Sequence, residues 1–270
     1  MSNKLLLFDV DGTIAESSKS INMDIKILLE KLYNKGYTIG IVGGGKIEKI
    51  LSQIGDNNFI KHYFSECGCV YHKNNLIDEV NNKVTNKIIN DCDKTMNIEE
   101  IYCKNLRKHK LYHTINHLIK KALFFLSAVD YTITGNFVDL RNGLVYISLI
   151  GMSASQKERE VYIELDKTRF YRKRLLGYLD NELFKLRDYE KITISEGGCC
   201  GIAIYPSEYD KTQVLKHLTP FYNEIHFFGD KYNVFGNDYK LINHELTIGY
   251  KVDTLNDTKN HLTELLYRLD

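Results

Sequence analysis

Two carboxylates one residue apart stand near the start of the chain, in the segment LLLFDVDGTI at residues 5–14. If residues 5–10 form a strand, Asp9 and Asp11 lie near one crevice at its end while Val10 points away. One carboxylate of such a pair can attack phosphorus and form an aspartyl phosphate, and the other can protonate the leaving oxygen. The spacing therefore favours phosphoryl transfer.

Such an attack needs cations, because the phosphate carries its own negative charge. A hard, oxygen-ligated ion, usually Mg²⁺, and a lysine would neutralise the site. Asp230 ends the apolar segment IHFFGD, and Asn237 and Asp238 lie just beyond it. Lys211 follows Asp210, a candidate helix N-cap, and would lie in the first helical turn, where it can reach toward anions.

These side chains need a sheet whose strands all end at the same edge. A strand, a helix and a second strand within about 40 residues are typical of a βαβ unit in a parallel sheet. The same pattern returns at the end of the chain, so we predict an α/β fold with a Rossmann-like parallel sheet built from both termini. The expected strands are 5–10, 37–42, 224–228 and 246–252, and the expected helices are 25–35 and 258–269.

The middle of the chain has a different pattern. Segments 137–140 and 144–150 flank an Asn-Gly pair, which predicts an antiparallel hairpin. Ser155 and Glu158 fit a capping box at the start of a long charged helix that continues to about residue 186. We expect an α+β cap domain at residues 84–188, inserted into a core of residues 1–83 and 189–270. The core would also hold two further candidate strands, 192–195 and 201–205.

Composition restricts the protein class. The chain has 270 residues, 43% of them hydrophobic, with 36 Lys plus Arg against 35 Asp plus Glu. A formal net charge of +1 gives no electrostatic reason to expect nucleic acid or a membrane as partner. No apolar run reaches the roughly 18 residues of a membrane span, and the first strand follows Met1 too closely for a signal peptide. We therefore expect a cytoplasmic protein whose six cysteines are reduced.

Several segments together resemble the haloacid dehalogenase superfamily, and more closely its eukaryotic-type phosphomannomutases. They are LLFDVDGTI, IGIVGGGKIEKI, FVDLRNGLVYISLIGMSASQKER, YDKTQVLKH and FFGDKYNVFGND, in that family's order. The resemblance implies a Mg²⁺-dependent cytoplasmic enzyme that dimerises through its cap. It would interconvert mannose 6-phosphate and mannose 1-phosphate for GDP-mannose synthesis, with a hexose 1,6-bisphosphate as intermediate and activator.

The resemblance also implies roles for individual residues. Asp9 would be the nucleophile, Asp11 the acid/base and Lys211 the third catalytic residue. Asp9 and Asp230, with the carbonyl of Asp11, would hold the cation, and Asn237 and Asp238 are further candidate ligands. The substrate-binding candidates are Lys19, Gly44, Gly45 and Arg141.

This chain departs from the family at the positions that bind the sugar phosphate. The resemblance aligns the family's arginines, serines and aspartate with uncharged residues at Ser18, Gly45, Thr134, Met152, Gly201 and Ala203. A mutase must hold the non-reacting phosphate, and each lost arginine bond to phosphate weakens that grip by about 1.5–3 kcal/mol. Three interpretations remain open: a mutase in which other basic residues such as Lys19, Lys46 or Arg107 stand in, a phosphatase for another small phosphorylated substrate, and a non-catalytic binding protein.

Overall fold

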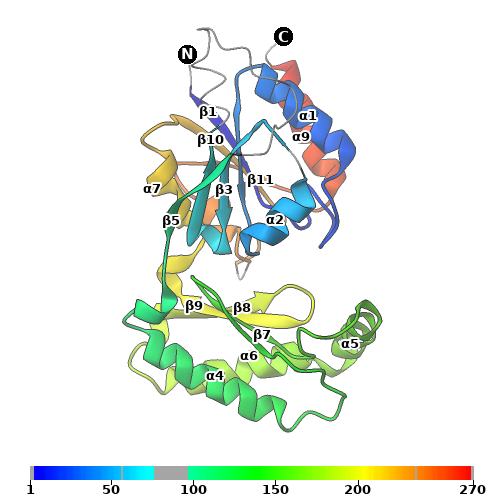
Figure 1. The fold of residues 1–270 in the computed structure, drawn as a ribbon, viewed down its shortest axis with the longest axis vertical. Helices are drawn as coiled ribbons and strands as arrows, with labels where there is room; N and C mark the ends of the chain where they lie inside the picture. Colours follow the sequence, from blue (N-terminus) through cyan, green and yellow to red (C-terminus); the bar gives the residue numbers. More distant parts are fainter. Residues whose placement is uncertain (1–2, 56, 76–96, 235, 269–270) are drawn as a thin grey trace. The chain divides into compact units, whose positions relative to one another are not determined.

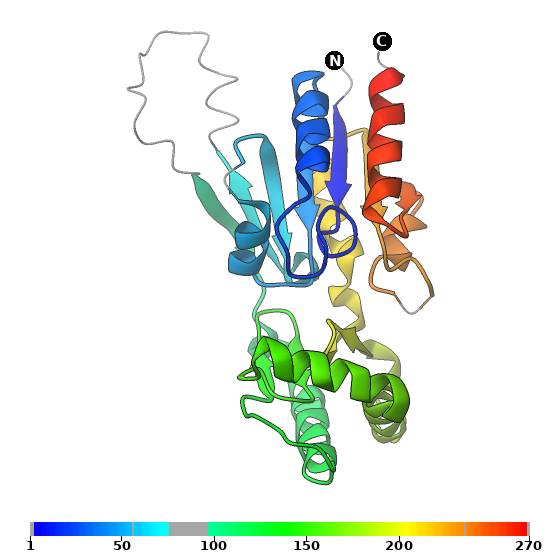
Figure 2. The ribbon, with the colours of Figure 1, turned by 90° about the vertical axis from the view of Figure 1, so that its right-hand side faces the viewer.

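The computed structural model describes residues 3–268 except residue 56, residues 76–96 and residue 235. The chain forms two compact units (Figures 1 and 2). Unit 1 combines Met1–Cys103 with Asp210–Asp270, and unit 2 is Lys104–Tyr209.

Unit 1 is built on a seven-stranded sheet. Its strands are β1 (Lys4–Phe8), β2 (Thr38–Val42), β3 (Ile60–Ser65), β4 (Val70–Asn74), β5 (Ile98–Cys103), β10 (Glu224–Gly229) and β11 (Ile248–Lys251). They lie in the order β11-β10-β1-β2-β3-β4-β5. The first five strands of that order are parallel, while β4 and β5 are antiparallel to their neighbours. The carboxyl ends of β1, β2 and β10 therefore share one edge.

Helices cover both faces of this sheet, because its central strands are apolar on both sides. Leu6 and Phe8 of β1 pack into one cluster with α1 (Met23–Asn34), α2 (Ile47–Ile54) and α9 (Leu255–Tyr267). Leu5 and Leu7 pack into another with α7 (Leu215–Leu218) and α8 (Tyr239–Ile242). Helices α1 and α9, blue and red in Figure 2, come from opposite ends of the chain and pack together.

Unit 2 is an antiparallel sheet with helices. The strands β6 (Val138–Leu140), β7 (Val145–Ser148), β8 (Ile192–Gly197) and β9 (Gly201–Pro206) lie in the order β6-β7-β9-β8. The helices are α4 (Tyr112–Leu126), α5 (Gln156–Arg169) and α6 (Tyr171–Phe184). Helix α6 contacts α4, β8 and β9, and Figure 1 shows α4 and α6 on one side of the sheet.

The predicted fold class is confirmed: a mostly parallel α/β core with an α+β insertion. The predicted hairpin is present as β6 and β7, and Ser155 with Glu158 forms the predicted capping box. The expected single helix to residue 186 is wrong, since Phe170 adopts a left-handed backbone conformation with φ of 56°. That residue ends α5 and precedes the first residue of α6, so the chain turns there.

The division of the chain also differs from the expected boundaries at 84 and 188. Strands β8 and β9, expected in the core, belong to the sheet of unit 2, where β9 pairs with β7 and β8 pairs with β9. Strand β5, expected in the cap, pairs with β4 in unit 1. Strand-length apolar runs reveal that a strand forms but not which partner it pairs with, because pairing depends on distant residues. The described part of the chain contains no helix long and apolar enough to span a membrane.

Candidate active site

A buried lysine joins two of the acidic residues that the sequence singled out. Lys211 lies in a 3₁₀ turn, Lys211–Val214, and Asp210 caps this turn as expected, since its side chain accepts from Thr212 N. Its Nζ donates to Asp9 Oδ1 and, at 2.6 Å, to Asp238 Oδ1. The side chain of Lys211 is 0% exposed. Since an unpaired buried charge is very unfavourable, the three groups stabilise one another's positions.

Asp9, Asp230 and Asp238 form an acidic cluster at the ends of β1 and β10. Each offers one oxygen, and these oxygens all lie within 4.8 Å of one another. Gly12 permits this approach: its φ is +89°, and a Cβ there would fall 2.5 Å from Asp230 Oδ2. Any side chain at position 12 would therefore displace the Asp230 carboxylate.

The surroundings of Asp9 oppose its ionisation in the absence of a cation. Burial raises the pKa of Asp9 to about 7, and the neighbouring carboxylates Asp238 and Asp230 act in the same direction against Lys211. Burial also raises the pKa of Asp230. For Lys211, burial lowers the pKa, but Asp238 and Asp9 outweigh it and the net shift is upward. A cation at the cluster would therefore stabilise the ionised carboxylates.

Asp11 lies in a separate network of hydrogen bonds. Its Oδ2 accepts from Lys49 Nζ at 2.6 Å, and its Oδ1 accepts from Gln53 Nε2 at 2.8 Å and from Ser18 N at 2.9 Å. Burial alone would raise the pKa of Asp11, but hydrogen bonds from Lys49, Ser18 and Gln53 outweigh it and lower the pKa. The carboxylate of Asp11 is not part of the acidic cluster. Of the oxygens of Asp11, the backbone carbonyl therefore stays the candidate metal ligand, as the family resemblance implies.

Lys49 and Gln53 were missed by sequence reasoning. They lie four residues apart on α2, so they share one face of the helix and reach the same carboxylate. A lysine and a glutamine at that spacing in an amphipathic helix are a weak signal, because such pairs are common on solvated faces. Only the D-x-D motif at the neighbouring strand end would have suggested a target for them.

Of the other predicted residues of unit 1, two glycines and an asparagine lie close together and a lysine is exposed. Gly44 and Gly45 connect β2 to α2, whose N-terminus has no side-chain cap. A Cβ on Gly44 would lie 3.9 Å from Asn237 Nδ2, and one on Gly45 would lie 3.1 Å from Lys49 Cδ. Asn237 Oδ1 is buried and has no hydrogen-bond partner among the described residues. The ammonium of Lys19, by contrast, is exposed and pairs with Glu16.

Unit 2 carries the remaining candidates. Arg141 follows β6, and its Nε donates to Asp139 Oδ2 at 2.7 Å. Thr134 and Met152 lie on adjacent segments, because Thr134 N donates to Ile150 O and Met152 N to Asn136 O. Arg159, which the sequence did not single out, donates to the carbonyl oxygen of Met152 at 2.8 Å. Gly201 and Ala203 are both in β9.

Comparison with known proteins places the chain in a family. A sequence profile described as eukaryotic phosphomannomutase matches residues 74–268. The chain belongs to the eukaryotic phosphomannomutase family. It is 35% identical over 265 residues to the phosphomannomutase of Saccharomyces cerevisiae, which covers 97% of this chain and 93% of the yeast protein. It is 30% identical over 265 residues to the phosphomannomutase of Drosophila melanogaster, covering 97% and 95% respectively. These matches confirm the resemblance, and the family is one of enzymes.

Solved structures of lower identity share the fold. An N-terminally truncated IMP-nucleotidase of Plasmodium falciparum has a TM-score of 0.63 at 14% identity, over 100% of this chain and 71% of that one. The C-terminal domain of a trehalose-6-phosphate phosphatase of C. albicans has a TM-score of 0.56 at 12% identity, over 100% and 94%. The phosphomannomutase family and these phosphatases thus have the same haloacid dehalogenase fold.

The buried ion pair makes a prediction for stability. Replacing Lys211 with methionine leaves the carboxylates of Asp9 and Asp238 buried without their cation, so the free energy of unfolding should fall by about 3 kcal/mol. Urea unfolding in EDTA measures it. Lys231→Met is the matched control, because Lys231 pairs with Asp230 at 3.1 Å at an exposed site and should cost less than about 1 kcal/mol. Equal losses in the two variants would contradict the role given to Lys211.

The hydrogen bonds to Asp11 make a prediction for protonation. Lys49 favours the ionised form, so Lys49→Met should raise the pKa of Asp11, and a larger fraction of Asp11 should be protonated at a given pH. Carboxyl ¹³C NMR of the metal-free protein follows this titration. Lys19→Met removes a nearby lysine that pairs with Glu16 instead and should give a smaller shift. An unchanged Asp11 pKa in Lys49→Met would rule out the contact.

Proposed function

We propose that this chain is a phosphomannomutase that interconverts mannose 6-phosphate and mannose 1-phosphate through an aspartyl phosphate on Asp9. The observation that carries the proposal is the separation of the two carboxylates of the D-x-D motif. Asp9 lies in the acidic cluster beside Lys211, while Asp11 is held by Lys49 and Gln53. One carboxylate thus has the surroundings of a nucleophile and the other those of a proton carrier.

The reaction follows from these positions. An oxygen of Asp9 attacks one phosphorus of a hexose bisphosphate, so that the bond from Asp9 to phosphorus forms, a hexose monophosphate leaves and the bond from phosphorus to the sugar oxygen breaks. That oxygen takes a proton from Asp11, which is left ionised. In the second half, Asp11 takes a proton from a hydroxyl of the hexose monophosphate, and the oxygen of that hydroxyl takes the phosphoryl group from Asp9. A hexose bisphosphate forms, and transfer of its other phosphate back to Asp9 completes the isomerisation.

The acidic cluster suits a magnesium ion. All its donors are carboxylate oxygens, which Mg²⁺ prefers, and ionisation of Asp9 without a cation is unfavourable. Both oxygens of Asp238 already accept hydrogen bonds, from Lys211 Nζ and Lys231 N. Asp9 and Asp230 would therefore hold the ion, with the Asp11 carbonyl and the unpartnered Asn237 Oδ1 as further ligands. Bound there, Mg²⁺ would offset the charge of the transferring phosphoryl group.

Two places in the chain suit phosphate oxygens. The N-terminus of α2, after Gly44 and Gly45, presents backbone N–H groups and the positive end of the helix dipole. In unit 2, Arg141 supplies a guanidinium that can bind phosphate by two parallel hydrogen bonds. We propose the first for the transferring phosphate and the second for the non-reacting one. Lys19 would need to leave Glu16 to take part.

A phosphatase for another small phosphorylated substrate is the second candidate, and the adjacent segments at Thr134 and Met152 favour it. Thr134 and Met152 both have uncharged side chains, so neither presents a cation to a second phosphate. The Thr134 hydroxyl instead donates to the carbonyl oxygen of Ile150 at 2.9 Å. A hydrolase requires less of these positions, because water and not a bound hexose monophosphate takes the phosphoryl group.

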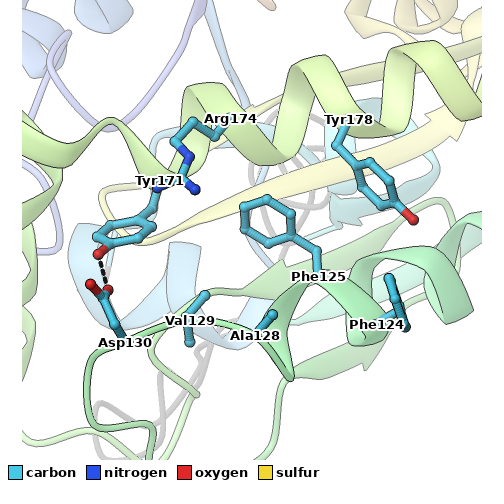
Figure 3. Close-up of a pocket in the computed structure, with 8 residues that line it drawn as sticks. All are labelled: Phe124, Phe125, Ala128, Val129, Asp130, Tyr171, Arg174 and Tyr178. Carbon is cyan, nitrogen blue, oxygen red and sulfur yellow. Dashed lines mark hydrogen bonds between the residues drawn. The ribbon is translucent and has the colours of Figure 1, made fainter.

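A homodimer formed through unit 2 completes the proposal. Phe124 is 69% exposed, and it lines a pocket of about 280 Å³ together with Phe125, Tyr171 and Tyr178 (Figure 3). Arg174 lies at its edge, and Tyr171 donates to Asp130. An exposed phenylalanine beside an aromatic pocket on α4 and α6 suits burial against a second copy of the chain.

We place this reaction in the cytoplasm, where its product, mannose 1-phosphate, would supply GDP-mannose synthesis.

The function is tested by incubating the protein with Mg²⁺ and mannose 1-phosphate, with and without glucose 1,6-bisphosphate. The formation of mannose 6-phosphate and of free phosphate is followed by ³¹P NMR. We expect mannose 6-phosphate to form only with the bisphosphate and without matching release of phosphate. EDTA, and separately Asp9→Asn, should lower the rate at least about a hundredfold. Phosphate release without mannose 6-phosphate would replace the mutase with the phosphatase, and retained turnover in Asp9→Asn would remove Asp9 as nucleophile.

The dimer is tested by placing a charge in the proposed interface. Phe124→Glu should shift the protein from dimer to monomer in light scattering, because burying an unpaired carboxylate opposes association. Phe221→Glu, at an exposed phenylalanine of unit 1, is the matched control and should stay dimeric. A wild-type protein that is monomeric at every concentration, or a dimeric Phe124→Glu, would contradict the proposed interface.

A further inference from the structure

The sheet of unit 2 has one face of buried apolar side chains and one face, called here the mixed face, that carries both polar and apolar side chains. Val145 and Ile147 of β7 and Ile202 and Ile204 of β9 are buried. Tyr146 lies between the first two along β7 and therefore points to the other face, as do its direct neighbours Asp139 of β6 and Ala203 of β9. The mixed face is the one that carries Arg141, two residues beyond Asp139.

The ring of Tyr146 lies close to two glycines, Gly201 of β9 and Gly197 of β8. A Cβ on Gly201 would fall 2.5 Å from the ring's Cζ and hydroxyl oxygen, and also 2.4 Å from the carbonyl oxygen of Ile147. A Cβ on Gly197 would fall 3.1 Å from ring atom Cε2. Neither glycine has a positive φ, so contacts and not backbone conformation exclude a side chain there. A side chain at position 201 would therefore displace the Tyr146 ring from its present position, and one at position 197 would crowd it.

The guanidinium of Arg141 is held between this ring and a carboxylate. Its Cζ lies 5.2 Å from the centre of the Tyr146 ring, a cation–π contact, and its Nε donates to Asp139 at 2.7 Å. The side chains of Arg141 and Asp139 are only 16% and 13% exposed. These two contacts therefore restrict the orientation of the guanidinium.

We propose that Tyr146 is a positioning residue that orients Arg141 toward the non-reacting phosphate of the substrate. The inference rests on the proposed function, which gives Arg141 that phosphate. With Thr134 and Met152 in place of two arginines of the family, the grip on this phosphate depends heavily on one guanidinium. An arginine that is oriented before binding loses less side-chain freedom when it binds, and its planar donor pair meets a phosphate only in the right direction.

The same arrangement accounts for Gly201 and Ala203, which stand where the family has a serine and an aspartate that contact the sugar. A serine at 201 would meet the Tyr146 ring in its present position.

The test uses the full-length protein with Mg²⁺ and three substitutions: Tyr146→Leu, which keeps bulk but removes the aromatic ring, Tyr146→Phe, which keeps the ring, and Arg141→Met. Tyr146→Leu should raise KM about fivefold to tenfold for mannose 1-phosphate in the bisphosphate-dependent assay, with kcat changed less than about twofold. Tyr146→Phe should keep the wild-type KM. Arg141→Met should raise KM for mannose 1-phosphate at least as much as Tyr146→Leu does, because it removes the guanidinium itself.

NMR supplies a readout that a merely structural role would not move. The Nε–H signal of Arg141 should carry a ring-current shift in the wild type and in Tyr146→Phe, and lose it in Tyr146→Leu. If Tyr146→Leu keeps the wild-type KM while Arg141→Met raises it, the positioning role is overturned and the role of Arg141 stands. If Arg141→Met also keeps the wild-type KM, the proposed phosphate contact fails, and with it the positioning role. If Tyr146→Leu unfolds, Tyr146→Phe with an altered KM or a lost ring-current shift would overturn the proposal on its own.

Discussion

The ion pair of Lys211 with Asp9 and Asp238 is the constraint on which the site depends. Lys211 and Asp9 are 202 residues apart in the sequence, and both are almost fully buried. A buried ammonium must have carboxylate partners, so folding cannot finish until the end of β1, the residues after β10 and the turn after β9 have met. The interaction that completes the fold of unit 1 is also the one that places Asp9, the proposed nucleophile.

The two carboxylates of the D-x-D motif differ because the chain surrounds them differently. Asp9 follows a buried strand and has a raised pKa. Asp11 accepts hydrogen bonds from two side chains of α2, Lys49 and Gln53, and from a backbone N–H, and its pKa is lowered. The separation of the two pKa values depends on α2, whose register brings Lys49 and Gln53 to the same face.

Much of unit 1 was predictable because its signals are local. The apolar strands at both ends of the chain, the D-x-D spacing and the acids after β10 follow from short stretches of sequence and from the rule that parallel strands end at one edge. The contacts of Asp11 were not predictable, since a lysine and a glutamine on a helix reveal no target. The break at Phe170 was missed for a different reason: a phenylalanine in the left-handed region is set by packing and not by its own preference. The pairing of β9 with β7 and β8 was missed because Gly197 and Gly201 signal a turn but give no sign of the Tyr146 ring that contacts them.

The chain thus combines a site typical of phosphoryl transfer with a substrate face altered from that of its family. Unit 1 holds the two carboxylates of the D-x-D motif, the buried lysine and the acidic cluster. Unit 2 holds Arg141, the arginine proposed for the non-reacting phosphate, in contact with Tyr146 and Asp139. Substrate preference is therefore where this protein is expected to differ from its relatives, and the reacting centre is where it should agree with them.

The central claim is that Asp9 carries the phosphoryl group. The most direct measurement is to incubate the protein with Mg²⁺ and glucose 1,6-bisphosphate, quench it, reduce any acyl phosphate with borohydride and locate the modified residue by mass spectrometry. The account predicts conversion of Asp9 alone to homoserine. Modification of Asp11 or another carboxylate, or none in a protein that turns substrate over, would contradict it.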